Sequence, residues 1–396
     1  MSLNTVTEGN RLHIGIFGKR NSGKSSLINA ITGQDVALVS DVAGTTTDPV
    51  KKAMEVPGVG PCMFIDTAGF DDLGELGKMR VEKTKKAVEK TDIAIIVFSD
   101  CDITKEIQWT ELIRGLDTPF IPVLNKTDIL NNSDTLARLI EDACGIPPLL
   151  VSAKTGMGID EIRREIVRKI PKDYDKEEIV GSLAKEGDTV LLVIPQDIAA
   201  PKGRLILPQV QTLRELMDKK CVAICCTDDK IDNALSSLSS PPDLIITDSQ
   251  VFDKVYSKKP KESKLTSFSI LFARFKGDID YFVQGAETID MLDEKSKVLI
   301  AEACTHAPLE EDIGRVKIPA LLRKKTGPGL KVDMVSGADF PDDLTPYNLI
   351  IHCGSCMFNR KHVLYRILQA KNQGVPMTNY GVTMAKLHGI LDKVDY

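Results

Sequence analysis

The sequence predicts an α/β protein in which a larger parallel sheet is followed by two smaller α/β units. Apolar strand-like runs alternate with helical patterns over residues 11–170, which is typical of a parallel sheet covered by helices on both faces. The alternation resumes in shorter form after residue 188, and a chain of 396 residues is too long for one ordinary core. We therefore expect domains at 1–172, 173–264 and 265–396.

Each expected element follows from a local run of residues. The strands expected in the first domain are HIGIFG, CMFIDT, AIIVFS, FIPVLN and LLVSA, and helical patterns follow Lys24, Leu76, Lys105, Asp134 and Ile159. The middle domain offers TVLLVIP, CVAICCT and DLIITD, and the last domain offers KVLIAEA, KVDMVSG and NLIIHC. The polar, charged stretch 171–188 interrupts the alternation and is expected to be a linker.

The composition is that of an ordinary globular protein, with 42% hydrophobic and 27% charged residues. A net charge of −5 argues against a general nucleic-acid or membrane-surface binder, because both need a basic footprint. The N-terminus lacks the pattern of a signal peptide, and no apolar run approaches the roughly 20 residues that cross a bilayer. We expect a cytoplasmic protein.

Nine cysteines are too sparse for a disulfide framework in a chain of this length. Six of them lie in or beside apolar stretches and are expected to be buried thiols: Cys62, Cys101, Cys144, Cys221, Cys225 and Cys226. The remaining three form a pattern of their own, which is considered below.

A phosphate-binding loop is predicted at residues 18–25, because GKRNSGKS fits the pattern GxxxxGK[ST] between an apolar strand and a helical run. Its backbone N–H groups and the helix N-terminus would surround phosphate oxygens. Lys24 would reach the β- and γ-phosphates, and Ser25 would bind Mg²⁺. The nucleotide-binding candidates here are Gly18, Asn21, Ser22, Gly23, Lys24, Ser25 and Ser26.

Three further motifs follow other strands in the order that a guanine-nucleotide site needs. Asp66 opens the sequence DTAG, where it would hold Mg²⁺ through water and the Gly69 amide would lie near the γ-phosphate. In Asn125-Lys126-Thr127-Asp128, the Asp128 carboxylate can accept two hydrogen bonds from guanine that adenine cannot offer. Backbone N–H groups of Ser152-Ala153-Lys154 would bind the guanine O6. Thr46, in GTTTD, would close over Mg²⁺.

Together these motifs resemble the GTPase superfamily. The resemblance implies a P-loop GTPase domain that binds GTP and GDP, with Mg²⁺ held by Ser25, Thr46 and Asp66, and it makes Lys24, Thr46, Asp66 and Gly69 the catalytic candidates. Phe70 stands where Ras-like GTPases carry the glutamine that orients water, so unaided hydrolysis should be slow. Asn21 resembles the asparagine that helps to hold K⁺ in GTPases of the tRNA-modification group. Glu75 is a further candidate for activating water, although a surface role is the simpler interpretation.

A second site is predicted near the C-terminus, where Cys304-Thr-His306 and His352-Cys353-Gly-Ser-Cys356 each follow an apolar strand. The carboxyl ends of parallel strands lie at one edge of a sheet, so the two clusters can meet. Thiols and imidazoles suit zinc or an iron–sulfur cluster. The ligand types leave this choice open, although five ligands exceed a closed tetrahedral zinc site.

With this pattern added, the chain resembles the [FeFe]-hydrogenase maturation GTPase family. The resemblance implies a [4Fe–4S] cluster on Cys304, Cys353 and Cys356, with His352 or His306 as a candidate fourth ligand. It also implies a scaffold and carrier for the diiron subcluster, which works with two radical-SAM maturases and an apo-[FeFe]-hydrogenase. The middle domain would mediate a homodimer, and neither nucleic acid nor membrane is expected as a partner.

Two alternatives remain open. One is a GTPase of the tRNA-modification or ribosome-assembly type with a structural zinc site, which the switch threonines and Asn21 favour. The acidic balance and an aromatic content of 5% weigh against it, because RNA binding uses basic and stacking residues. The other is a redox module built on the CxxC sequence, which no neighbouring basic residue supports.

Overall fold

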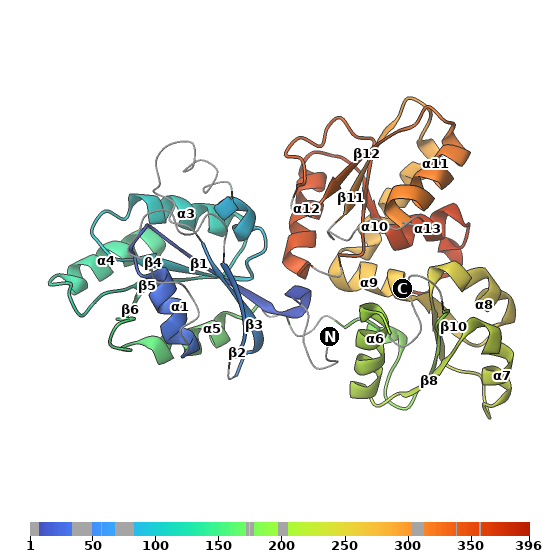
Figure 1. Ribbon diagram of the computed structural model, residues 1–396, viewed down its shortest axis with the longest axis horizontal. Helices are drawn as coiled ribbons and strands as arrows, with labels where there is room; N and C mark the ends of the chain where they lie inside the picture. The colour runs from blue at the N-terminus through green and yellow to red at the C-terminus, as the bar shows by residue number, and fades with distance from the viewer. Residues whose placement is uncertain are drawn as a thin grey trace. The chain divides into compact units, whose positions relative to one another are not determined.

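The computed structural model describes residues 8–33, 50–56, 58–67, 83–171, 174, 178–196, 205–302, 313–337, 339–355 and 358–396. The chain divides into two compact units, Met1–Tyr174 and Asp175–Tyr396, and both are α/β (Figure 1). Within the described ranges, none of the helices has both the length and the hydrophobicity that crossing a bilayer requires.

The first unit is built on a six-stranded sheet. Its strands, in spatial order, are β2 (Val50–Val56), β3 (Gly60–Asp66), β1 (Leu12–Gly18), β4 (Ile93–Phe98), β5 (Phe120–Leu124) and β6 (Leu149–Leu150). All neighbours are parallel except β2, which pairs antiparallel with β3 at the edge. Strand β2 was not expected from the sequence, because Lys52 interrupts the apolar alternation that signals a half-buried strand.

Helices cover both faces of this sheet, as the alternation predicted. On one face, α1 (Lys24–Thr32) and α5 (Ile159–Lys169) pack isoleucines and leucines on the strands, and on the other α3 (Thr104–Gly115) and α4 (Ser133–Cys144) do so (Figure 1). Strands β1, β3, β4 and β5 are buried almost throughout, which explains their near-continuous apolar runs. Polar side chains that could bind a ligand are therefore expected in the loops at the carboxyl edge of the sheet.

The second unit holds two parallel four-stranded sheets. The first has the order β10 (Lys264–Ser267), β9 (Leu244–Thr247), β7 (Thr189–Val193) and β8 (Val222–Cys226). The second, called sheet C below, has the order β12 (Lys331–Ser336), β11 (Lys297–Glu302), β13 (Leu349–His352) and β14 (Met377–Asn379). The strands expected from the sequence in this unit are all present. The short strands β10 and β14 were not expected.

The helices of the second unit join its two sheets through a shared core. They are α6 (Leu207–Asp218), α7 (Ile231–Ser236), α8 (Phe252–Lys258), α9 (Phe268–Lys276), α10 (Ile279–Glu287), α11 (Ile318–Thr326), α12 (Arg360–Asn372) and α13 (Tyr380–Leu387). One hydrophobic cluster runs from Leu191 and Ile245 of the first sheet to Ile300 and Ile350 of sheet C. The division expected at 264/265 passes through the start of β10, and the three-domain organisation stays a prediction.

Two local expectations were wrong. The stretch 171–188 is not entirely a linker, because Ile179 and Val180 are buried and their N–H groups donate to the Glu215 carboxylate at 2.5 and 2.8 Å. Their apolar side chains outweigh the charged surroundings that suggested a linker. Cys101 and Cys225 are exposed rather than buried, the first in a loop and the second on the edge strand β8.

Candidate functional site

The phosphate-binding loop lies between β1 and α1 as predicted, and its conformation depends on glycine. Gly23 has a φ of 91°, a region that side chains with a Cβ rarely adopt, and a Cβ there would come within 2.3 Å of Asn125 Nδ2. A Cβ on Gly18 would lie 2.6 Å from the Val97 carbonyl oxygen. Between them, Asn21 is exposed with a φ of 59°, and Ser22 is buried. The loop thus keeps its backbone close to neighbouring strands.

The Lys24 ammonium is buried inside the curve of this loop. Its Nζ donates to the Gly18 carbonyl at 2.9 Å and to the Lys19 carbonyl at 2.7 Å. These two carbonyls therefore fix the place from which Lys24 would reach phosphate oxygens. Ser25 and Ser26 follow in the first turn of α1, beside the loop.

The structure brings together two of the predicted Mg²⁺ ligands. Ser25 Oγ donates to Asp66 Oδ2 at 2.6 Å, although the residues are 41 positions apart. Burial raises the pKa of the Asp66 carboxyl, while the Ser25 hydrogen bond and the Lys24 charge oppose that rise. A divalent cation would favour the carboxylate form here, because it adds positive charge next to it. Thr46, Gly69, Phe70 and Glu75 lie outside the described residues.

The predicted guanine-binding residues form one connected corner at the ends of β5 and β6. Asn125 is 1% exposed, and it links the other motifs: its Nδ2 donates to the Ser22 carbonyl at 3.0 Å and its Oδ1 accepts from Ala153 N at 3.1 Å. Ser152 Oγ donates to Asp128 Oδ1 at 2.8 Å. The Lys126 ammonium donates to the Asn21 carbonyl. Asp128 and Lys154 remain exposed, as a base-binding edge requires.

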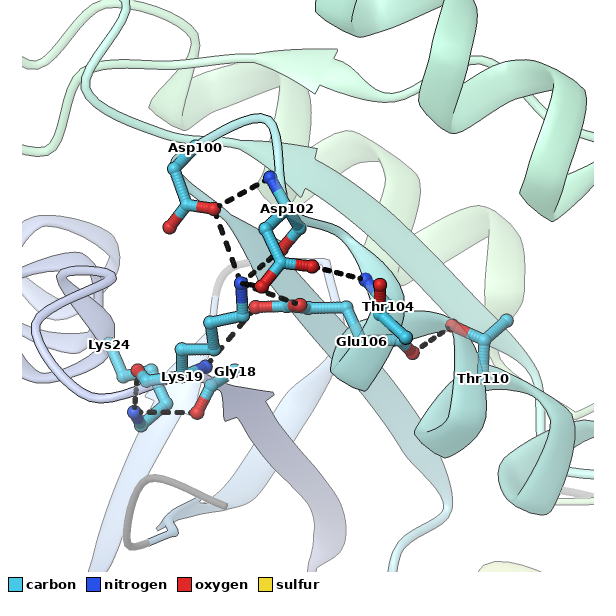
Figure 2. Close-up of polar contacts among 8 residues, drawn as sticks. All are labelled: Gly18, Lys19, Lys24, Asp100, Asp102, Thr104, Glu106 and Thr110. Atoms are coloured by element: carbon cyan, nitrogen blue, oxygen red, sulfur yellow. Dashed lines mark hydrogen bonds and ion pairs between the residues drawn. The ribbon is translucent and has the colours of Figure 1, made fainter. Parts of the chain in front are cut away.

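A charged cluster that the sequence analysis missed supports the loop from behind (Figure 2). The Lys19 ammonium lies 3.2 Å from Asp100 Oδ1, 3.3 Å from Asp102 Oδ2 and 3.8 Å from Glu106 Oε2. Glu106 is almost fully buried on α3, where Trp109, Thr110 and Ile113 share its buried face. The signal in the sequence is an acidic residue at an apolar position of an amphipathic helix.

The carboxyl edge of sheet C holds the two described members of the predicted metal site. His352 ends β13 and is fully buried, and Cys353 follows it half-buried. Cys353 Sγ accepts a hydrogen bond from the Ser355 backbone N–H at 3.4 Å, and Ser355 has a φ of 53°. The turn therefore directs a backbone donor at the thiol, and such donors stabilise thiolates at metal sites.

Both ring nitrogens of His352 have partners. Arg366 Nη1 lies 2.9 Å from His352 Nε2, and since an arginine N–H only donates, Nε2 accepts and the ring proton is on Nδ1. Nδ1 faces the Cys353 carbonyl at 2.9 Å and Ser355 Oγ at 3.0 Å. For His352 to bind iron in this arrangement, one of these hydrogen bonds must break.

Arg366 is a second site residue that the sequence analysis missed. It is 1% exposed, donates to the Gly337 carbonyl at 2.7 Å and lies over the rings of Phe340 and Phe358. On α12 it shares the buried face with Val363, Ile367 and Ala370, so a charged residue again occupies an apolar position of a helix.

The remaining predicted ligands, Cys304, His306 and Cys356, lie outside the described residues. Among the residues that are described, no group of three or more His, Cys, Asp or Glu side chains is placed to hold a metal. The topology still relates the two clusters, because β11 and β13 are neighbours with Ala301 paired to His352. Cys304 follows the end of β11 by two residues, and Cys353 follows the end of β13 by one.

Comparisons with known protein families agree with this arrangement of units. Residues 13–126 match a family model described as 50S ribosome-binding GTPase. Residues 179–277 match the Hydrogen maturase F dimerization domain, and residues 280–394 match the Hydrogen maturase F tetramerization domain. The first unit is therefore a P-loop GTPase domain that binds GTP and GDP with Mg²⁺, followed by domains that support oligomerisation. The chain belongs to the hydrogen maturase F family of GTPases.

Individual relatives match only part of the chain. GTPase Der of Wolinella succinogenes is 38% identical over an alignment of 196 residues, which covers 44% of this chain and 40% of that protein. The tRNA modification GTPase MnmE of Chromobacterium violaceum is 35% identical over 163 residues, 40% of this chain and 35% of that protein. A crystal structure of Era with MgGDPNP and part of 16S ribosomal RNA is 21% identical over 54% of this chain and 92% of that chain, with a TM-score of 0.37. The chain thus spans 40% or less of the length of GTPase Der and of MnmE.

Proposed function

We propose that this protein is a GTP-hydrolysing scaffold that carries the diiron subcluster, as cargo, to apo-[FeFe]-hydrogenase. The two hydrogen maturase F domains in the second unit support this, together with the CxH…HCxxC residues. The single observation that carries the metal part is the pairing of β11 with β13, because the cysteine-bearing segments begin at adjacent carboxyl ends of one sheet.

In this proposal, Cys304, Cys353 and Cys356 are the thiolate ligands of a [4Fe–4S] cluster, and an exchangeable fourth ligand is supplied by His306 or His352. The residues that are described fit such a group. The Cys353 thiol is half-buried at the sheet edge and accepts the Ser355 N–H, as thiolates that bind iron–sulfur clusters do. When bound, the cluster would supply an iron site to which the diiron cargo could attach.

For GTP hydrolysis, we propose that Lys24 and the loop N–H groups stabilise the negative charge of the transition state. Mg²⁺ held by Ser25, Asp66 and Thr46 would contribute to the same stabilisation. Water would attack the γ-phosphate in line with the leaving oxygen. Because Phe70 cannot orient this water, turnover without a partner should be slow. The exposed Asn21 would help to hold a K⁺ ion that stimulates hydrolysis. Asp128 with Asn125 and Ala153 would select guanine.

The GTP state can affect cargo handling only if GTP and GDP forms differ in affinity for something. We propose that this difference lies in contacts with the two radical-SAM maturases and the apo-hydrogenase. A homodimer formed through the dimerization domain would present two copies of the cargo site.

The test is anaerobic reconstitution with iron and sulfide, followed by iron analysis and ultraviolet–visible spectroscopy. Wild-type protein should become brown, with the broad absorption of thiolate-bound iron–sulfur clusters. Cys353→Ser should lose most of the iron, whereas Cys225→Ser, a change at an exposed cysteine of the same unit, should not. A Cys353→Ser protein with a full cluster would remove this residue from the proposed ligand set.

A second candidate function comes from the relatives, several of which are tRNA modification GTPases. In that case the cysteines would hold zinc, and the chain would act on RNA. Colourless protein containing zinc, together with RNA binding that weakens steeply with salt, would favour this function over the scaffold.

A further inference from the structure

The backbone N–H and carbonyl of Lys19 both make contacts that shape the phosphate-binding loop (Figure 2). Its carbonyl oxygen accepts from Lys24 Nζ at 2.7 Å and from Ser22 N at 3.3 Å. Its own N–H donates to Glu106 Oε1 at 3.4 Å. The backbone of Lys19 is therefore hydrogen-bonded both to Glu106 of α3 and to the side chain of Lys24.

The side chain of Lys19 also contacts α3, through an ion pair with Glu106. The side chain is 11% exposed, and its ammonium points toward Asp100, Asp102 and Glu106. It also donates to the Asp102 carbonyl. Lys19 thus joins β1 to the β4–α3 loop and to the first turn of α3.

The acidic partners are themselves held in place. Asp100 Oδ1 accepts from Asp102 N at 3.0 Å, and Asp102 Oδ1 accepts from Thr104 N at 3.3 Å, so the loop before α3 is braced by its own carboxylates. Glu106 is 2% exposed and lies over the core formed by Trp109 and Ile113. A residue bonded to this group has little freedom to move.

A buried carboxylate of this kind is costly to keep, because desolvation disfavours its charge. Burial raises the pKa of Glu106 to about 7, while hydrogen bonds and the Lys19 charge oppose the rise. Burial alone would lower the pKa of Lys19, but the attraction of Glu106 and the contacts of Asp100 and Asp102 raise it above its usual value. A hydrophobic residue at position 106 would satisfy the core better, so the charge requires another explanation.

We infer that Lys19 and Glu106 are positioning residues for GTP hydrolysis, which hold the Gly18 and Lys19 carbonyls and thereby the direction in which Lys24 approaches the β- and γ-phosphates. Stabilisation of phosphoryl transfer depends on charges that are already in place, and a small misplacement of such a charge reduces the rate strongly. Neither residue belongs to the phosphate-contacting set, and the inference holds whether or not the metal site is real.

The protonation state of Glu106 should then affect the rate. The groups that face its carboxyl are Lys19 from the loop and Asp100 and Asp102 from the segment before α3, and Lys19 is the cation among them. The carboxylate form holds the ammonium, and the neutral form keeps only the Lys19 N–H as a donor to Oε1. Catalysis should therefore rise with pH through a region near neutrality.

The experiment measures kcat and KM for GTP, and GDP affinity, from pH 5.5 to 8.5 with full-length protein. Glu106→Gln keeps the size of the side chain and an acceptor for Lys19 N–H but removes the charge. We expect kcat at pH 8 to fall about tenfold, as loss of one charge-assisted contact allows. KM and GDP affinity should change by less than about threefold, because Gln preserves the shape of the loop. The wild-type rise in kcat near pH 7 should be absent in this variant.

Two further variants separate positioning from a general structural effect. Lys19→Arg retains the charge and should keep kcat within about threefold of wild type, since arginine pairs well with carboxylates. Glu111→Gln removes an exposed carboxylate from the same helix and should leave kcat and its pH profile unchanged. Fluorescence of Trp109, the single tryptophan, reports whether each variant is folded. A Glu106→Gln protein with wild-type kcat and pH profile would overturn the inference.

Discussion

The nucleotide site and the edge of sheet C both lie at the carboxyl ends of parallel strands, but they present different chemistry. The nucleotide site is made mainly of backbone groups, and Lys24, Ser22 and Asn125 hold that backbone through hydrogen bonds. The ligands that we propose at the sheet C edge are side chains, and among them the Cys353 thiol accepts a hydrogen bond from the Ser355 N–H. Phosphate binding would thus depend on the precise course of the chain, and the proposed metal binding would depend on where a few side chains point.

Both sites nevertheless share one device, a buried charge on the apolar face of the supporting helix. Glu106 of α3 contacts Lys19 behind the phosphate-binding loop, and Arg366 of α12 contacts His352 behind the Cys353 turn. Each is a charge on a buried helix face, where removal from water disfavours it. Such charges are consistent with a need to fix the loop that they contact, and the predictions below test this in each unit.

The largest effect is expected from Lys24→Ala. Removing the ammonium takes away the charge next to the β- and γ-phosphates, so kcat/KM for GTP should fall by about a thousandfold or more. Steady-state phosphate release measures it. Lys105→Ala, at an exposed position of α3, is the control and should hydrolyse GTP at the wild-type rate. Comparable rates in the two variants would contradict the assignment of Lys24.

Asp128→Asn should change the base that is bound. Guanine would donate two hydrogen bonds to the carboxylate, and loss of these charge-assisted bonds should weaken GDP binding by about a hundredfold. Xanthine, which has a carbonyl in place of the amine, should bind the variant better than guanine does. Titration with fluorescent GDP and XDP checks this, and retained preference for GDP would show that another residue reads the base.

Arg366→Met should destabilise the second unit without affecting the first. The change removes the donor to His352 Nε2 and to the Gly337 carbonyl, so the second unit should lose about 3 kcal/mol of stability. Hydrogen exchange of sheet C measures the loss, and Trp109 fluorescence should show no change in the first unit. Arg323→Met, on the exposed face of α11, serves as the matched control. Equal protection in both variants would mean that Arg366 does not hold the turn.

The smallest effect concerns the stability of the first unit against pH. The pKa of Glu106 is raised from 4.5 to about 7 in the folded chain, so folding favours the protonated form. Its contribution is fully present below pH 4.5 and is lost as the pH rises through 7. Glu106→Gln should therefore be more stable than wild type at pH 8 and equal to it below pH 4.5. Denaturant titration followed by Trp109 measures this, and a variant less stable at pH 8 would reverse the assigned sign.

Much of the fold was predictable because buried parallel strands produce long apolar runs, as in β4 and β13. The guanine corner was also predictable, since its motifs follow those strands directly. The edge strand β2 was not, because half-exposed strands at an edge carry mixed residues such as Lys52. Glu106 and Arg366 escaped notice for a different reason: a charge on an apolar helix face reveals its partner only when a distant segment is folded against it.

The most direct measurement of the central claim is activation of apo-[FeFe]-hydrogenase. Full-length protein would be purified without oxygen from cells that also make the two radical-SAM maturases, and then mixed with the apo-enzyme and GTP. Our account predicts that hydrogen evolution appears with wild type and with Cys225→Ser, and that Cys353→Ser leaves the enzyme inactive. Iron-loaded wild type that fails to activate the hydrogenase, or a Cys353→Ser protein that activates it fully, would contradict the account.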